Sequence, residues 1–426
     1  MNTQQQWIAQ SPEPWNIVLA GPGSGKTFTI IERAKMLKTR GVDPKSMAFV
    51  TFTNIGAAVL RRRLKETVGD VGFVGTLHAM MLRLLRQADR RWIMVNEDDA
   101  AAFLARYAKT VGYTGTATKL EAAAREIEET DGFVTPELRV VRAYRDFMRR
   151  ERMLDFSMVL TEGLALIKEH GQPWSAWFVD EFQDSAPIDM DIYRTANPEH
   201  LLIVGDPDQA IYRFRGASLD AFDKAWNSKM FEPHTLEANY RCSARVCDVA
   251  NAVAGRIRHR IKKSVSCATM VDGEVRTHAF SNDLTEARAY PEMIKERLNR
   301  GVAPGDIAVL CRTNRLVDQI RDELHVAGVP VCWTETEKKP KDWRLLTMLI
   351  QQIASPESWP NARLLAREQA RIQKKDPDEA EKVVMGYDFM VTTPAEVWSL
   401  PSAKVVLSLN ADFSRYGVGK AAHELL

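Results

Sequence analysis

A glycine-rich stretch near the N-terminus combines residue types that can hold a chain of phosphates. The segment Ala20-Gly-Pro-Gly-Ser-Gly-Lys-Thr27 departs from the strict phosphate-binding P-loop pattern only in having Ala where the first Gly usually stands. Its glycines allow backbone N–H groups to turn inward around phosphates at a helix N-terminus. The alternative is a strand-to-helix turn without a ligand, which the flanking strand and helix patterns disfavour. The residues expected to contact the phosphates and Mg²⁺ are Gly21, Gly23, Ser24, Gly25, Lys26 and Thr27.

A second segment supplies the carboxylates that phosphate chemistry needs. Trp177-Phe-Val-Asp-Glu-Phe-Gln-Asp184 reads as an apolar strand that ends in acidic residues. Asp180 is predicted to bind Mg²⁺ together with the Thr27 hydroxyl, and Glu181 to act as the base that orients water. An apolar strand ending in acidic residues is common by itself, so this prediction depends on the P-loop.

The elements that must position these residues form an alternating pattern. Short apolar runs alternate with helical patterns such as Phe28 to Leu37, which predicts an α/β fold with a parallel sheet covered by helices. The runs predicted as strands are Ile17 to Ala20, Met47 to Phe52, Trp177 to Asp180, Leu201 to Val204 and Ile307 to Leu310.

Between about Leu82 and Gly171 the pattern becomes mostly helical, which we interpret as an insertion in the first α/β domain. A second α/β domain is expected from Leu236, with one helix at Val317 to Ala327. The helices predicted in the insertion are Asp98 to Val111, Leu120 to Glu129, Pro136 to Arg150 and Phe156 to Glu169.

Composition narrows the class of protein without identifying it. The 426 residues are 45% hydrophobic, and 58 basic against 56 acidic residues leave a net charge of +2. Any contact with nucleic acid is therefore expected in a local groove. The five cysteines form no CxxC pair, so neither zinc nor a disulfide framework is indicated, and a reducing cytoplasm fits best. No export signal or membrane span is expected.

Several further motifs follow one another in the order and spacing of a known family, the UvrD/Rep DNA helicases of superfamily 1A. Asp180–Asp184 resembles motif II of that family, Val204–Ala217 resembles motif III and Leu236–Ser243 resembles motif IV. Phe49–Asn54 is similar to motif Ia, and Gly75–His78 to motif Ib. Leu154–Phe156 also resembles a family element just before motif II. The similarity covers about residues 1–324.

The resemblance implies RecA-like motor domains and assigns further nucleotide contacts. Gln5 matches the glutamine that reads adenine, and Tyr240 would stack on that base. Gln209 resembles the glutamine that senses the γ-phosphate, and Arg241 the arginine that stabilises its developing charge. Without the resemblance, Gln5 is better interpreted as a solvated residue, and Tyr240 and Arg241 as ordinary surface residues.

The resemblance also implies a single-stranded DNA site, in which aromatic side chains stack on bases while hydroxyls and cations hold the backbone. Taken individually, such aromatics are usually core residues and a lone histidine is usually structural. The DNA-contacting residues carried over are Phe52, Thr53, Asn54, Thr76, His78, Tyr212, Phe214 and Arg215.

The activity that the resemblance implies is ATP-dependent movement along DNA with unwinding at junctions, and the 3′–5′ direction is carried over from the family. Patterns resembling motifs V and VI are not found, so the second motor domain is expected to be incomplete. A second polypeptide, a fragment or divergence remain open, as does a regulatory DNA-binding subunit that does not translocate. The expected domains are 1–84 and 175–235 (1A), 85–174 (1B-like insertion), 236–345 (partial 2A) and 346–426 (2B-like insertion or divergent tail).

Overall fold

The computed structural model describes residues 1–95, 97–116, 119–120, 123, 135–210, 219–257, 260–269, 271, 273–329 and 331. The chain divides into two compact units, Met1–Glu274 and Val275–Leu426, which are described separately. The five predicted domain ranges stay predictions.

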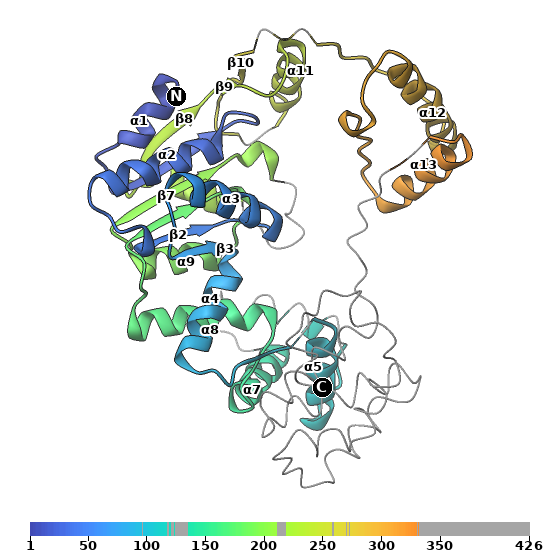
Figure 1. Ribbon diagram of the computed structural model, residues 1–426. Helices are drawn as coiled ribbons and strands as arrows, with labels where there is room; N and C mark the ends of the chain where they lie inside the picture. The colour runs from blue at the N-terminus through green and yellow to red at the C-terminus, as the bar shows by residue number, and fades with distance from the viewer. Residues whose placement is uncertain are drawn as a thin grey trace, which may run out of the picture. The chain divides into compact units, whose positions relative to one another are not determined.

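A six-stranded parallel sheet, ordered β3-β2-β6-β7-β1-β8, forms the centre of the first unit (Figure 1). Parallel strands end at one common edge of a sheet, so the segments that follow them gather there. The predicted α/β fold is confirmed, as are four of the five predicted strand positions. The strands are β1 (Trp15–Ala20), β2 (Met47–Val50), β3 (Phe73–Gly75), β6 (Ala176–Val179), β7 (His200–Gly205) and β8 (Glu232–Leu236).

Helices cover both faces of this sheet, and all residues of β1, β2 and β6 are buried as a result. Phe49 and Phe178 stack at 4.5 Å between ring centroids on the face covered by α1 (Thr3–Gln10), α2 (Lys26–Thr39) and α3 (Asn54–Thr67). On the opposite face, Trp177 meets Tyr193 of α9 (Pro187–Ala196) at 6.0 Å. Nearby, α10 (Leu219–Trp226) places Phe222 against Phe182.

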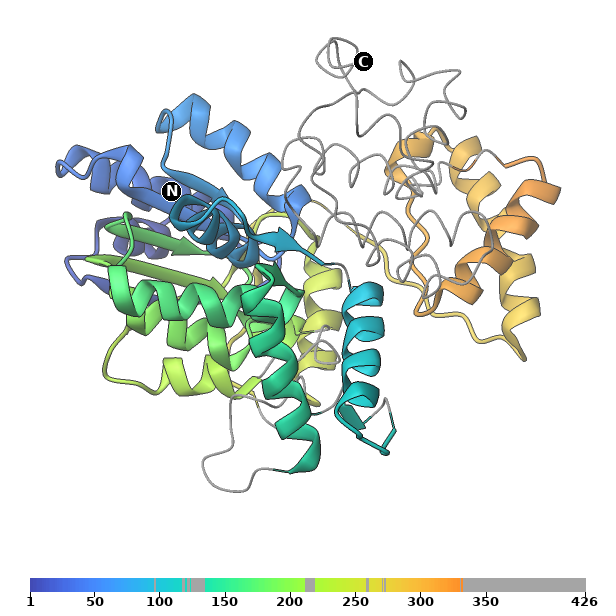
Figure 2. The same cartoon turned by 90° about the horizontal axis from the view of Figure 1, so that it is seen from below.

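The predicted helical insertion lies beside the sheet (Figures 1 and 2), where α4 packs on α8 and α5 packs on α7. The predicted helix Leu120 to Glu129 lies largely outside the described residues. A two-stranded parallel pair, β4 with β5, was not predicted, because two-residue strands carry no readable periodicity. The elements are α4 (Leu77–Ala88), β4 (Ile93–Met94), α5 (Glu97–Thr110), α7 (Pro136–Arg150), β5 (Met153–Leu154) and α8 (Phe156–His170).

Short elements complete the first unit at the carboxyl edge of the sheet. The 3-10 helix η2 (Phe182–Asp184) follows β6, and η3 (Pro207–Gln209) follows β7. After β8 come β9 (Ala238–Asn239), α11 (Ala244–Ala254) and β10 (Ser266–Cys267), and β9 pairs with β10 in parallel.

The second unit, in its described part, holds α12 (Asp283–Asn299) and α13 (Asn314–Val326), which pack through a small apolar core. The predicted helix at Val317 to Ala327 is confirmed. The predicted strand Ile307 to Leu310 is wrong: this run follows η5 (Pro304–Asp306) without regular structure, and Leu310 is 90% exposed. A strand needs a hydrogen-bonded neighbour, and the described residues of this unit supply none. Within the described chain, no helix has the length and apolar character to span a membrane.

Candidate functional site

The P-loop joins the end of β1 to the start of α2 and is closely packed by other segments. Gly23 and Gly25 have φ angles of 65° and 83°, a left-handed conformation that glycine adopts without steric cost. Space also requires glycine at position 23, because a Cβ there would stand 2.7 Å from the Cβ of Arg241. The Ser24 hydroxyl donates to the carbonyl of Gly21 at 2.8 Å and closes the turn. The sequence therefore builds a loop whose backbone can approach a ligand closely.

Gln5 and Tyr240 lie against this loop, and their contacts with adenine stay predictions. The Gln5 amide donates to the carbonyl of Ser24 at 3.1 Å, and the backbone N–H of Tyr240 donates to the carbonyl of Gly23 at 2.9 Å. Asn2 caps α1 and donates to the Tyr240 hydroxyl at 2.9 Å. The Tyr240 side chain is 47% exposed, which leaves ring surface available to a ligand.

The acidic pair after β6 contacts the residues that begin α2. Lys26 Nζ lies 3.0 Å from Glu181 Oε2, and the Thr27 hydroxyl donates to Asp180 Oδ2 at 3.3 Å. Chain segments more than 150 residues apart thus converge as the sequence predicted. This contact joins the lysine predicted to bind phosphate to the carboxylates predicted to bind the metal and to orient water.

The electrostatics of the pair favour a cation. Burial, and then the neighbouring charge of Glu181, raise the pKa of Asp180 to about 6. The same two causes raise the pKa of Asp184 to about 6. A divalent cation would stabilise the ionised form of Asp180. Mg²⁺ prefers hydroxyl, carboxylate, phosphate and water oxygens, so Thr27 and Asp180 fit its requirements.

Glu181 itself has an unusual backbone. Its φ of 56° and ψ of 43° lie in the left-handed region, which costs a residue other than glycine about 1–3 kcal/mol. The turn begins η2 and leaves the carboxylate in contact with both Lys26 and the Gln183 amide, the latter at 3.0 Å. Strained residues of this kind concentrate at functional sites.

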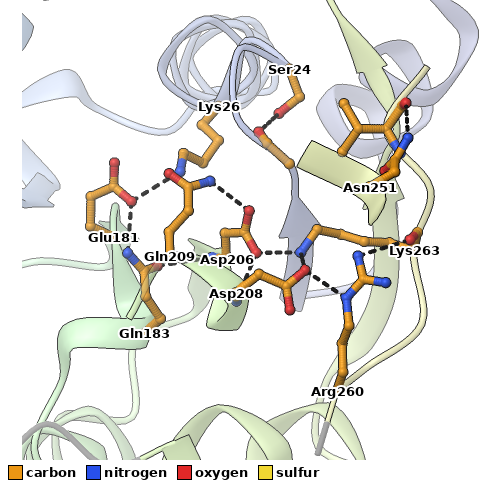
Figure 3. Close-up of polar contacts among 12 residues, drawn as sticks. Ser24, Lys26, Glu181, Gln183, Asp206, Asp208, Gln209, Asn251, Arg260 and Lys263 are labelled. Carbon is orange, nitrogen blue, oxygen red and sulfur yellow. Dashed lines mark hydrogen bonds and ion pairs between the residues drawn. The ribbon is translucent and has the colours of Figure 1, made fainter. Parts of the chain in front are cut away.

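The sequence analysis missed two residues that link the segment after β7 to the acidic pair: Asp206, which follows β7, and Gln183 of η2. Asp206 is fully buried, and its Oδ2 accepts from the Gln209 amide at 2.5 Å (Figure 3). Its backbone N–H donates to Gln183 Oε1 at 2.8 Å, which connects this segment to the acidic pair. A polar side chain at the end of a buried strand is a signal that could have identified Asp206, and likewise Gln183 within its apolar surroundings.

Asn239 is a third missed residue, and it fixes Arg241 beside the P-loop. Its side-chain oxygen accepts from the backbone N–H groups of Arg241 and Cys242 at 2.8 and 2.7 Å, and its amide donates to the carbonyl of Pro22 at 2.7 Å. The Arg241 side chain is exposed. The backbone of Arg241 therefore lies beside the P-loop, and its contact with the γ-phosphate stays a prediction.

Five of the eight residues predicted to contact DNA lie after β2 and β3, at the same edge of the sheet but away from β1. Thr53 caps the N-terminus of α3 and accepts from the N–H of Gly56 at 3.0 Å, and Asn54 begins the helix. Thr76 caps α4 and accepts from the N–H of Ala79 at 3.2 Å. Each threonine hydroxyl can still donate, and helix N-termini attract phosphates. Phe52 is half-buried next to Thr53.

His78 stacks on Phe156, the first residue of α8, with ring centroids 3.7 Å apart and planes 15° apart. Burial lowers the pKa of His78 to about 4, so the imidazole is uncharged at neutral pH. His78 can therefore donate one N–H to DNA but cannot neutralise a phosphate. Phe156 is 50% exposed and was not predicted as a contact. Tyr212, Phe214 and Arg215 lie outside the described residues.

The pKa of His78 predicts acid sensitivity of the fold. Between the unfolded value near 6.5 and the folded value near 4, the unfolded chain binds more protons, so stability is lost as pH falls through this window. His78→Phe, which keeps an aromatic ring on Phe156, should reduce the loss of unfolding free energy between pH 7.5 and 4 by about 2–3 kcal/mol. Urea titrations at both pH values measure it. His170→Gln, at an exposed position, is the control; equal pH dependence in wild type and His78→Phe would contradict the prediction.

A parallel sheet with a glycine-rich loop after β1 and an acidic pair after β6 defines a P-loop nucleotide-binding protein of RecA-like architecture. Family models narrow this class. The model of the UvrD/REP helicase N-terminal domain matches residues 1–99 and 113–229, and that of the UvrD-like helicase C-terminal domain matches residues 234–339. The chain belongs to the UvrD/Rep helicase family.

Curated relatives agree with this assignment. DNA helicase II of Escherichia coli is 27% identical over 365 residues, which cover 78% of this chain and 51% of that protein. The putative ATP-dependent DNA helicase YjcD of Bacillus subtilis is 27% identical over 78% of this chain and 48% of its own length. ATP-dependent DNA helicase UvrD1 of Mycobacterium bovis is 27% identical over 77% and 48%. The chain spans about half the length of the curated relatives it matches.

Proposed function

We propose that the chain binds Mg²⁺ and ATP at the P-loop and couples ATP hydrolysis to 3′–5′ movement along single-stranded DNA, with unwinding at junctions. The observation that carries the proposal is the contact of Lys26 with Glu181 at 3.0 Å and of Thr27 with Asp180 at 3.3 Å. These contacts support the proposal, because they bring together the lysine proposed to bind phosphate, the pair proposed to hold the metal and the glutamate proposed as the base.

Each residue has a role that follows from its chemistry. The phosphates of ATP would replace Glu181 as the partner of Lys26, which frees the Glu181 carboxylate to orient water. Thr27 and Asp180 would hold Mg²⁺, which neutralises charge on the phosphate oxygens when bound. Gln209 would contact the γ-phosphate, and Arg241 would stabilise the charge that develops there.

DNA is proposed to lie along the carboxyl ends of β2 and β3. The N-termini of α3 and α4, capped by Thr53 and Thr76, offer donors to phosphates. The half-exposed ring of Phe156, supported by His78, offers a surface on which a base can stack. The roles of Tyr212, Phe214 and Arg215 remain as the sequence predicts them. The names of the relatives, all DNA helicases, support this substrate.

The test is ATP hydrolysis by the full chain with Mg²⁺, measured with and without single-stranded DNA. We expect DNA to raise kcat at least tenfold, because a motor hydrolyses ATP productively only on its track. ATP-modulated DNA binding with little turnover would instead favour the regulatory subunit, and unwinding by the chain alone would exclude that alternative. Absence of DNA-stimulated hydrolysis, alone and with candidate partner chains, would refute the motor.

A further inference from the structure

A buried lysine contacts the γ-phosphate-sensing segment from a distant part of the chain. Lys263, in the loop between α11 and β10, has a side chain that is 2% exposed and pairs with Asp206 and with Asp208, the latter at 2.6 Å (Figure 3). Arg260 Nε reaches Asp208 at 2.8 Å and its terminal nitrogen donates to the carbonyl of Lys263 at 3.1 Å. Two cations and two carboxylates thus form one cluster.

This cluster is continuous with the nucleotide site. Asp206 accepts from Lys263 with one carboxylate oxygen and from the Gln209 amide with the other, at 2.5 Å. The Asp206 backbone N–H donates to the side-chain oxygen of Gln183, and the Gln183 amide donates to Glu181. Glu181 also accepts from Lys26. An unbroken series of hydrogen bonds therefore runs from the P-loop lysine to Lys263.

The cluster also joins the two regions that different family models match. Asp206 and Asp208 fall in residues 113–229, matched by the N-terminal domain model, and Arg260 and Lys263 fall in residues 234–339, matched by the C-terminal domain model. Burying a charged pair brings little net stability, because desolvation offsets the attraction between the charges. Stability alone is therefore a weak explanation for a lysine here.

We propose that Lys263 is a positioning residue for Gln209, and this rests on the proposed function. Lys263 fixes the Asp206 carboxylate, and that carboxylate fixes one N–H of the Gln209 amide. The second N–H and the carbonyl oxygen of Gln209 are left to meet the γ-phosphate and the attacking water. Movement of the Arg260–Lys263 segment would move Gln209, so this cluster couples the C-terminal domain region to hydrolysis.

Lys263→Met tests the proposal in the full chain, with Lys262→Met as the matched control because Lys262 is the exposed neighbour. We expect Lys263→Met to lower the Tm and to reduce kcat about tenfold to hundredfold, as a misplaced group does. The Kd of a fluorescent ATP analogue should stay within about threefold, because the ion pairs of Lys263 are with Asp206 and Asp208, and methionine can keep the contact that the Lys263 methylene groups make near Gly21. Lys262→Met should match wild type in every measurement.

The double variant Asp206→Asn with Lys263→Met separates positioning from folding. Removing both charges eliminates the unpaired buried carboxylate, so the Tm should recover towards wild type. The kcat should stay low, because Gln209 is still unsupported. Recovery of kcat together with Tm, or wild-type kcat in Lys263→Met, would show that Lys263 only stabilises the fold.

Hydrogen exchange distinguishes failure of this inference from failure of the proposed function. The N–H groups of Asp208 and Gln209 are bonded to Asp206, at 3.0 and 2.9 Å. Exchange in residues 206–210 should be at least tenfold faster in Lys263→Met and unchanged in Lys262→Met. If wild type hydrolyses no ATP but exchange still accelerates, the motor proposal fails while the positioning role stands. Unchanged exchange overturns the inference itself.

Discussion

Lys26→Ala is expected to weaken ATP binding about a hundredfold, since a hydrogen bond to a charged group contributes about 1.5–3 kcal/mol and 1.4 kcal/mol corresponds to a factor of ten. Lys26 is the cation at the start of α2, and its contact with Glu181 shows that Nζ reaches the centre of the site. The substitution also leaves Glu181 without its counter-charge, which makes the site repel phosphates further. Titration with a fluorescent ATP analogue measures the change.

Lys35→Ala is the control for this measurement. Lys35 lies on the same helix, pairs with Glu32 at 2.7 Å and is 38% exposed, so its loss should leave nucleotide affinity unchanged. Comparable thermal unfolding of both variants shows that the fold is intact. If Lys26→Ala bound nucleotide as tightly as Lys35→Ala, the assignment of the P-loop would be wrong.

The second large effect is expected for Glu181→Gln, which should slow ATP hydrolysis without weakening nucleotide binding. Glutamine has the same shape and can still accept a hydrogen bond from Lys26, so nucleotide affinity should change by less than about threefold. An amide cannot act as a base, and losing a general base costs about 10²–10⁴-fold in rate. Single-turnover release of phosphate, measured beside equilibrium nucleotide binding, separates the two effects.

Glu199→Gln is the matched control, because Glu199 is exposed and precedes β7 at the opposite edge of the sheet. It should hydrolyse ATP at the wild-type rate. Normal turnover by Glu181→Gln would assign the base elsewhere, and Asp184 would then be the next carboxylate to test, because its pKa is raised to about 6 in the same cluster.

β1, β2, β6 and β7 were predictable, because parallel strands covered on both faces read as continuous apolar runs. β3 is equally buried but was missed, because its three residues are too few to form a readable apolar run. β8 was missed, because Glu232-Pro-His-Thr-Leu236 reads as a loop. In the structure it is an edge strand, where Pro233 can pair with Ile17 since only one side carries a neighbour. The segment Ile307 to Leu310 was wrongly predicted as a strand because it is an apolar run. Such a run forms a strand only where a neighbouring strand can pair with it.

Some residues of the candidate site were predictable from the sequence and others were not. The P-loop was predictable because it is a contiguous motif between a strand and a helix, and the acidic pair was predictable because it could be interpreted together with the P-loop. Asn239 and Lys263 were not predictable, because their partners are distant: Asn239 contacts a carbonyl 217 residues away, and Lys263 contacts a carboxylate 57 residues away. Contacts between residues so far apart leave no periodic pattern in the sequence. They form only when the chain folds and these residues meet at the edge of the sheet.

The left-handed backbone at Glu181 means that thermal stability and the proposed catalysis favour different residues at this position. Glycine would relieve about 1–3 kcal/mol of backbone strain there but would remove the carboxylate. A library randomised at this codon and screened only for heat resistance would therefore enrich inactive proteins. A glutamate at a position where glycine would be less strained is expected if its carboxylate is needed for the proposed hydrolysis.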